Sequence, residues 1–163
     1  MLVGVVSDTH NNIKNIKKII CLFNEEQVDL VIHTGDISKA ETLRIFSELD
    51  APLVGVFGNN DRIEEGLKEV CVEYNFNFEE PPLSINLKGK KIVVFHEPDL
   101  IKDYIKEHKD IDLILYGHTH RYKEEKIDKT VYFNPGESAG SMEGKSALGI
   151  VNLNNLEIRR IFF

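Results

Sequence analysis

The first half of the chain alternates between short apolar runs and longer segments in which apolar residues recur every three or four positions. The apolar runs predict strands that are covered on both faces: Leu2–Val6, Val28–His33 and Leu53–Phe57. The periodic segments predict helices: one from a cap at Asn11 or Asn12 to about Asn24, then Ala40–Leu49 and roughly Ile63–Glu73. The first helix carries its apolar face on Ile13, Ile16, Ile19, Ile20 and Phe23. This strand–helix order predicts parallel strands joined by crossover helices.

The second half has shorter strands and more turns. Lys88-Gly89-Lys90 separates Leu83–Leu87 from Lys91–Phe95 and predicts a hairpin with glycine in its turn. A short helix near Leu100–Lys106 precedes a predicted strand at Leu113–Tyr116. The remaining predicted strands are Tyr122–Ile127, Thr130–Phe133, Ala147–Leu153 and Glu157–Phe162. Parallel units that lead into antiparallel hairpins fit an α/β fold, a four-layer αββα sandwich of two mixed β-sheets flanked by helices, formed by a single domain over residues 1–163.

Composition is that of an ordinary globular protein and excludes few functions by itself. The 163 residues are 42% hydrophobic and 29% charged, which suits one domain with a buried core. A net charge of −7 argues against a nucleic-acid partner, because phosphate backbones are bound mainly by Lys and Arg. No apolar stretch is long enough to span a membrane, and the first residues lack the basic start of a signal peptide. We therefore expect no membrane partner and a cytoplasmic location.

The two cysteines, Cys21 and Cys71, lie among apolar neighbours and match no zinc-binding spacing. We expect both to be buried free thiols, which suits a reducing compartment. Without cysteine ligands, a structural zinc site dominated by thiolates is not expected.

Polar residues with metal-binding chemistry follow several of the predicted strands. Because the carboxyl ends of strands in open α/β sheets form ligand sites, we expect these side chains to converge. The candidate metal ligands are Asp8, His10, Asp36, Asn59, His96, His118 and His120. Their imidazole, carboxylate and amide groups suit first-row transition metals, and their number suits two ions that share a bridging carboxylate.

The spacing of these residues suggests how they reach a common site. Asp8 and His10 are two residues apart, as are His118 and His120, so in extended backbone each pair points one way. Asp36 follows a glycine at a strand end, and its two carboxylate oxygens can bind two ions about 3.5–4 Å apart. The sequence therefore predicts a binuclear metal centre with Asp36 between the ions.

These ordered motifs resemble those of the calcineurin-like metallophosphoesterase superfamily, which run Asp-x-His, Gly-Asp, Gly-Asn-His-Asp/Glu, His and Gly-His-x-His. The resemblance extends from Asp8 to Asn134-Pro135-Gly136 and is strongest to small single-domain archaeal and bacterial phosphodiesterases. It implies that Asp8, His10, Asp36 and His120 hold the first metal, and that Asp36, Asn59, His96 and His118 hold the second. It also implies two divalent ions, with Mn favoured over Ni, Fe, Zn or Co, and a bridging water or hydroxide as the nucleophile.

Two positions depart from the family pattern. Asn60 stands where many relatives have a histidine that is thought to protonate the leaving group or to bind the phosphate. Asparagine donates a hydrogen bond but cannot act as a general acid, so esters with poor leaving groups should react slowly. Glu97 stands where many relatives have glycine after the ligand histidine, and it either reaches the site or points to solvent.

Other polar residues near the motifs have roles that the sequence leaves open. Asp61, a candidate catalytic residue together with Asn60, either orients a metal ligand or caps the helix that follows. We expect His33 to be a packed, hydrogen-bonded histidine rather than a ligand. Arg62 and Arg121 adjoin site motifs and are candidates to bind a phosphate, although surface arginines commonly neighbour a motif without binding its ligand.

The leading interpretation is a phosphodiesterase that acts on a small phosphodiester. A phosphomonoesterase or nucleotide hydrolase with the same site is an alternative, and so is a non-catalytic scaffold of the same fold that binds other proteins. The complete ligand set favours catalysis, because a buried cluster of Asp and His without a metal is costly. The C-terminal Ile161-Phe162-Phe163 fits either a homodimer face or the end of a buried strand.

Overall fold

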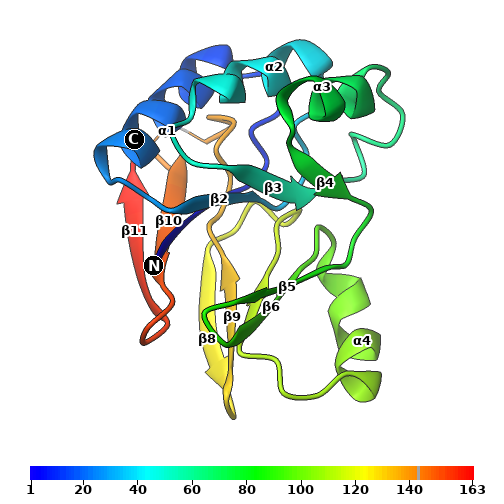
Figure 1. Cartoon of the computed structure of the whole chain (residues 1–163), viewed down its shortest axis with the longest axis vertical. Helices are drawn as coiled ribbons and strands as arrows, with labels where there is room; N and C mark the ends of the chain where they lie inside the picture. The colour runs from blue at the N-terminus through cyan, green and yellow to red at the C-terminus, as the bar shows by residue number, and fades with distance from the viewer. Residues whose placement is uncertain (143) are drawn as a thin grey trace.

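The computed structural model describes residues 1–142 and 144–163. It contains two β-sheets that pack face to face, with helices on the outer face of each (Figure 1). The six-stranded sheet has the strand order β11-β10-β1-β2-β3-β4, and the five-stranded sheet has the order β5-β6-β7-β9-β8. Both sheets mix parallel and antiparallel pairs. The predicted four-layer αββα sandwich is therefore confirmed.

The six-stranded sheet is built from the first half of the chain and its C-terminal hairpin. Its parallel strands are β1 (Leu2–Val6), β2 (Leu30–His33), β3 (Leu53–Val56) and β4 (Asn77–Glu79). Its antiparallel strands are β10 (Ala147–Asn152) and β11 (Glu157–Phe162). The connecting helices are α1 (Ile13–Glu25), α2 (Ala40–Ile45) with a 3₁₀ turn at Phe46–Glu48, and α3 (Leu67–Tyr74). The three helices lie together on the outer face of this sheet (Figure 1).

The five-stranded sheet is built from the second half of the chain. Its strands are β5 (Leu83–Leu87), β6 (Lys90–Val94), β7 (Leu113–Leu115), β8 (Lys123–Ile127) and β9 (Thr130–Asn134). The predicted β5–β6 hairpin forms, and both residues of its turn have positive φ, +51° at Lys88 and +76° at Gly89, as in a type I′ turn. One helix, α4 (Ile101–Glu107), follows a 3₁₀ turn at Pro98–Leu100 and packs on the outer face of this sheet.

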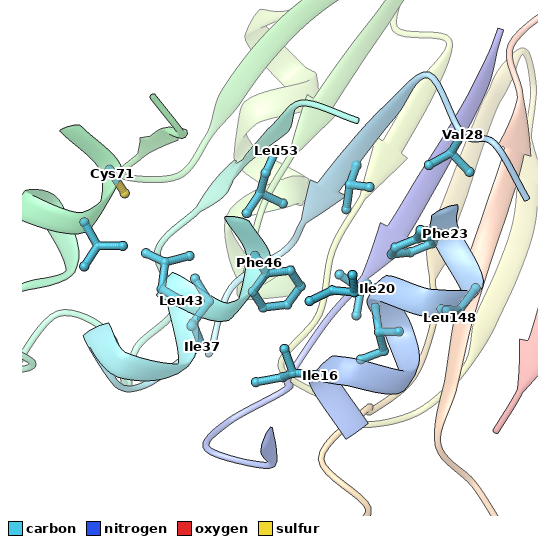
Figure 2. Close-up of a cluster of buried hydrophobic side chains, with 14 of the residues drawn as sticks. Ile16, Ile20, Phe23, Val28, Ile37, Leu43, Phe46, Leu53, Cys71 and Leu148 are labelled. Atoms are coloured by element: carbon cyan, nitrogen blue, oxygen red, sulfur yellow. The ribbon is translucent and has the colours of Figure 1, made fainter. Parts of the chain in front are cut away.

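Apolar side chains fill the spaces between the layers. Figure 2 shows Phe46 between Ile20 of α1 on one side and Leu43 of α2 on the other, within the core under the helices. A second core lies between the sheets and includes Val5 and Leu115 from strands that end beside the predicted ligands. Since this packing holds both sheets face to face, loops from the two sheets meet at one end of the sandwich.

Several boundaries differ from the predictions. Helix α3 begins at Leu67 rather than Ile63, because the intervening residues form turns, and Ile63 itself is 84% exposed. Strand β4 was not predicted, since Asn77-Phe78-Glu79 is short and mostly polar. The second helix ends at Ile45 and continues as a 3₁₀ turn. The other elements agree to within two residues at each end.

Two predictions about the first helix were partly wrong. Asn12 is the N-cap, with its side chain accepting a hydrogen bond from the Asn15 N–H at 3.0 Å, and Ile16, Ile19, Ile20 and Phe23 are buried. Ile13, however, is 48% exposed at the first turn. Cys21 is also exposed, whereas Cys71 is buried as expected. Within the described residues, no helix has the length and apolarity needed to cross a membrane.

Candidate metal centre

The predicted ligands converge on one end of the sandwich. Asp8 and His10 follow β1, Asp36 follows β2, Asn59 follows β3, His96 follows β6, and His118 and His120 follow β7. The first four residues come from loops of the six-stranded sheet, and the last three come from loops of the five-stranded sheet. The site therefore lies where the two sheets meet.

One group of ligand atoms comprises Asp8, His10 and His120, whose atoms all lie within 4.8 Å of one another. His120 Nε2 is 3.4 Å from Asp8 Oδ1 and 3.5 Å from His10 Nε2. The other ring nitrogen of His10 lies 3.3 Å from Ser38 Oγ, a contact that orients the imidazole toward the group.

A second group comprises Asp8, Asp36 and His96, again within 4.8 Å. His96 Nε2 is 3.4 Å from Asp36 Oδ1 and 3.0 Å from Asn59 Oδ1. His118 reaches this group through Asn59, because its Nδ1 is 2.9 Å from the same amide oxygen. His96 Nδ1 lies 2.8 Å from the Thr34 carbonyl oxygen, to which it donates, so Nε2 is directed toward the ligand oxygens.

These atoms have the chemistry that divalent cations require. Asp8 Oδ1 is buried and accepts no hydrogen bond from any described residue, although a buried carboxylate oxygen normally has a partner. The donor set of carboxylate oxygens, imidazole nitrogens and an amide oxygen is the one that Mn, Fe, Co, Ni and Zn accept. The residues at this end of the sandwich therefore fit divalent metal ions.

The charges of the site are coupled. Burial raises the pKa of Asp36, but hydrogen bonding and charge from His96, together with hydrogen bonds from Asn60, hold it well below its usual range. Burial lowers the pKa of His96, and the facing Asp36 carboxylate outweighs this effect and raises it. The facing Asp8 carboxylate raises the pKa of His120. Asp36 thus stays ionised, which its predicted role requires.

The backbone at the ligands is left-handed rather than extended. The residues concerned have φ values between +44° and +66°: Asp8, His10, Asp36, His118 and His120. The extended-backbone explanation for the Asp8/His10 and His118/His120 pairs was therefore wrong, since each of these residues lies in a left-handed turn. Residues other than glycine rarely adopt this conformation, and it persists only where the surrounding structure enforces it.

Two glycines allow the loops to approach this closely. A Cβ atom at Gly58 would collide with the Asp36 carboxylate and its backbone nitrogen. Gly35 has a φ of +104°, and a Cβ there would lie 2.6 Å from His96 Nδ1. The Gly-Asp and Gly-Asn motifs therefore need glycine for steric reasons.

Asp61 joins two of the ligand loops. Asp61 is 3% exposed, and its carboxylate accepts backbone N–H groups from Asp36 at 2.9 Å, Gly58 at 2.8 Å and Ser38 at 2.6 Å. Burial raises the pKa of this carboxyl, although the three N–H donors oppose that shift. Its side chain caps no helix, since the next helix starts only at Leu67. Of the two roles expected for Asp61, orienting a metal ligand or capping the next helix, its contacts match the first.

Asn60 contacts the carboxylate of Asp36. Its backbone N–H donates to Oδ1 at 3.0 Å, and its side-chain amide donates to Oδ2 at 2.7 Å. Asn60, which stands where many relatives have a histidine, therefore hydrogen-bonds to the predicted ligand Asp36.

The two arginines beside the motifs have different surroundings. Arg62 pairs with Glu97 at 3.1 Å and with Glu80 at 3.6 Å, so Glu97 points to this arginine. Arg121 forms no ion pair within the described part of the chain.

His33 is packed behind the ligand loops, as predicted. It is fully buried, with Nε2 3.0 Å from Thr9 Oγ1 and with Nδ1 accepting the Gly35 N–H at 3.1 Å. Burial lowers its pKa to about 3, which keeps the imidazole neutral.

Sequence reasoning missed several residues that support the site. Ser7 hydrogen-bonds to the Asp8 carboxylate, and Ser38 contacts His10. Glu137 is fully buried, accepts the Gly140 N–H at 2.8 Å and contributes to the raised pKa of His120. Ser7 and Ser38 could have been identified from the sequence, because each lies within two residues of a predicted ligand. Nothing in the sequence near Glu137 indicates that it is buried.

Comparisons with known proteins agree with this geometry. The model of the calcineurin-like phosphoesterase superfamily domain matches residues 1–155. A phosphodiesterase of Methanocaldococcus jannaschii is 33% identical over 167 residues, which cover 99% of this chain and 98% of that protein. A probable metallophosphoesterase of the same organism is 30% identical over 137 residues, which cover 83% of this chain and 67% of that protein.

Solved structures share the fold. The structure of an archaeal phosphodiesterase superposes with a TM-score of 0.89 at 32% identity and covers 100% of both chains. Vps29 of Entamoeba histolytica, solved in complex with Zn²⁺, superposes with a TM-score of 0.70 at 18% identity over 99% of each chain. The second match shows similarity of fold alone.

Proposed function

The chain belongs to the calcineurin-like phosphoesterase superfamily, and from this premise we propose that it hydrolyses a small phosphodiester with two divalent cations. The observation that carries the proposal is the convergence of the predicted ligands from both sheets around Asp8, whose buried Oδ1 accepts no hydrogen bond from the described residues and faces His120 at 3.4 Å. Because both sheets supply ligands, residues 1–163 act in this proposal as one catalytic domain. The homodimer and the cytoplasmic location stay predictions.

The proposed ligands divide between the two ions. Asp8, His10, Asp36 and His120 would hold the first ion, and Asp36, Asn59, His96 and His118 would hold the second. We favour Mn, with Ni, Fe, Zn and Co as alternatives. When bound, the ions supply an activated water at neutral pH and neutralise charge on the phosphoryl oxygens.

The protein's own residues position these ligands. Asp61 fixes the loops after β2 and β3 relative to each other through three backbone N–H groups. Asn60 holds the orientation of the Asp36 carboxylate through two hydrogen bonds. Because its amide cannot donate a proton to a leaving group, the enzyme prefers diesters whose leaving groups are acidic.

A diester fits the surroundings better than a monoester. A phosphate diester carries one negative charge, whereas a monoester carries nearly two at neutral pH. The net charge is −7, and the nearby Arg62 is already engaged by Glu80 and Glu97. The phosphodiesterase of M. jannaschii, which matches nearly the whole chain, supports the same choice. A phosphomonoesterase with the same ligands is the second candidate.

The test is hydrolysis of bis(p-nitrophenyl) phosphate by metal-stripped protein, titrated separately with Mn, Ni, Zn and Mg, beside p-nitrophenyl phosphate. We expect activity that returns with added metal, saturates near two equivalents and favours the diester. Faster cleavage of the monoester would support the second candidate. No cleavage despite two bound ions would indicate a narrower natural substrate, whereas no cleavage and no metal binding would favour the non-catalytic scaffold. His118→Ala should lose most of the restored activity, and His108→Ala, an exposed histidine on the α4 side, is the matched control.

A further inference from the structure

A cavity of about 480 Å³ opens at the loops that follow β6 and β7, next to the start of α4. Its lining residues are Pro98, Tyr116, Thr119, Arg121, Tyr122 and Lys123. Thr119 lies between His118 and His120, and Pro98 is two residues after His96. The cavity is therefore built from the same two loops that present ligands from the five-stranded sheet.

Among the described residues, Arg121 is the cation of this cavity that no carboxylate engages. Lys123 pairs with Glu125 at 2.7 Å. Arg62, the other arginine beside a motif, is held by two carboxylates. Arg121 has neither a carboxylate partner nor an aromatic stack among the residues that the structure describes.

Tyr122 gives the cavity a fixed aromatic wall. Tyr122 is 41% exposed, and Arg160 Cζ lies 4.3 Å from its ring centroid, although Arg160 does not line the cavity. Its hydroxyl donates to Glu124 at 2.7 Å, and its ring meets Phe133 edge to face at 6.2 Å. These contacts fix the orientation of the ring before any ligand binds.

We propose that this cavity binds a nucleoside substituent of the substrate phosphodiester, with the base against Tyr122 and its polar edge against Arg121. The cavity volume lies within the range typical of small-molecule sites. Every nucleobase offers a π-face that stacks on an aromatic ring. The guanidinium presents a fork of donors that matches the oxygen acceptors of a base or ribose. The proposal rests on the proposed function and adds the class of substrate to it.

The experiment compares two diesters with the same leaving group, thymidine 5′-(p-nitrophenyl phosphate) and methyl p-nitrophenyl phosphate, on the metal-loaded protein. The quantity measured is the ratio of their kcat/KM values. We expect Tyr122→Leu to lower this ratio at least fivefold, since the stacking of one base is worth roughly that factor or more. Arg121→Gln should also lower it, because the fork of guanidinium donors is lost. Tyr122→Phe should retain the ratio because it keeps the ring. Arg44→Gln, whose arginine pairs with Glu73 elsewhere, is the matched control.

A binding readout separates this inference from the proposed function. Thymidine alone is titrated into the metal-free protein, and the ring resonances of Tyr116 and Tyr122 are followed by NMR. Saturable shifts that Tyr122→Leu abolishes would support the cavity, even if the loaded protein cleaves neither diester and the proposed function fails. Unchanged ratios in Tyr122→Leu and Arg121→Gln, or a thymidine titration that leaves both tyrosines unmoved, would overturn the nucleoside site.

Discussion

Replacing Asp61 with asparagine tests whether one buried carboxylate holds two of the ligand loops together. The carboxylate accepts three backbone N–H groups, two on Oδ2 from Asp36 and Gly58, and one on Oδ1 from Ser38. Asparagine keeps a single acceptor oxygen. If that oxygen replaces Oδ2, the amide nitrogen faces the Ser38 N–H, and one buried donor is left without a partner.

The expected loss of stability follows from these contacts. A hydrogen bond to a charged group contributes about 1.5–3 kcal/mol. The two remaining bonds weaken because their acceptor is now neutral. Burial of the Asp61 charge is unfavourable, as its raised pKa shows. Because asparagine is neutral, the substitution removes this cost and offsets part of the lost stability. We expect a net destabilisation of about 2 kcal/mol, which lowers Tm by roughly 4–8 °C for a chain of this length.

The assay is thermal unfolding of the metal-free protein at pH 7, followed by a manganese titration. The positioning role predicts that Asp61→Asn also weakens manganese binding by about tenfold or more. Asp112→Asn is the matched control, because Asp112 accepts the Lys91 N–H at 2.9 Å and pairs with Lys90 at a partly exposed site remote from the ligands. The control should cost less stability and leave manganese affinity unchanged. A Tm within about 1 °C of wild type and an unaltered manganese Kd for Asp61→Asn would refute this reasoning.

Three further substitutions test other parts of the site. Asp36→Asn should abolish activity and weaken the binding of both ions, which turnover and metal-content measurements would show. Full activity with two bound ions would exclude a bridging role for Asp36. Asn60→His should raise turnover of diesters with poor leaving groups more than turnover of activated diesters. An equal change for both kinds of diester would contradict the inference that position 60 lacks a general acid. His33 binds its proton near pH 3 in the fold and near 6.5 when unfolded, so the unfolded state binds more protons between these values. Stability should therefore fall as pH is lowered from 6.5 toward 3, by up to about 1.4 kcal/mol per pH unit. Urea unfolding across this range should show a shallower fall in His33→Asn, and an identical pH slope would contradict the buried neutral histidine.

The ligand loops were predictable because each follows an apolar strand. Leu2–Val6 and Leu113–Leu115 are buried throughout or nearly so, and a polar metal-binding residue directly after such a run marks where the chain leaves the sheet. The βαβ order then places the ends of parallel strands on one side. These patterns are local, and the sequence carries them directly.

Other features depend on contacts between distant residues. The three hydrogen bonds of Asp61 join loops from two strands, and no spacing within Gly58-Asn59-Asn60-Asp61 indicates that Ser38 lies beside it. The left-handed φ values of the ligands follow from packing in the assembled loops rather than from residue type. Cys21 was misjudged because its neighbours are apolar, although it lies outside the buried stripe of α1. The difference between Arg62 and Arg121 likewise depends on Glu80 and Glu97, which are distant in sequence.

The central claim is that two ions share Asp36. The most direct measurement is anomalous diffraction from crystals of the protein grown with manganese. The account predicts two manganese peaks about 3.5–4 Å apart, with one oxygen of Asp36 coordinating each. A single peak, or two peaks that do not share Asp36, would contradict it.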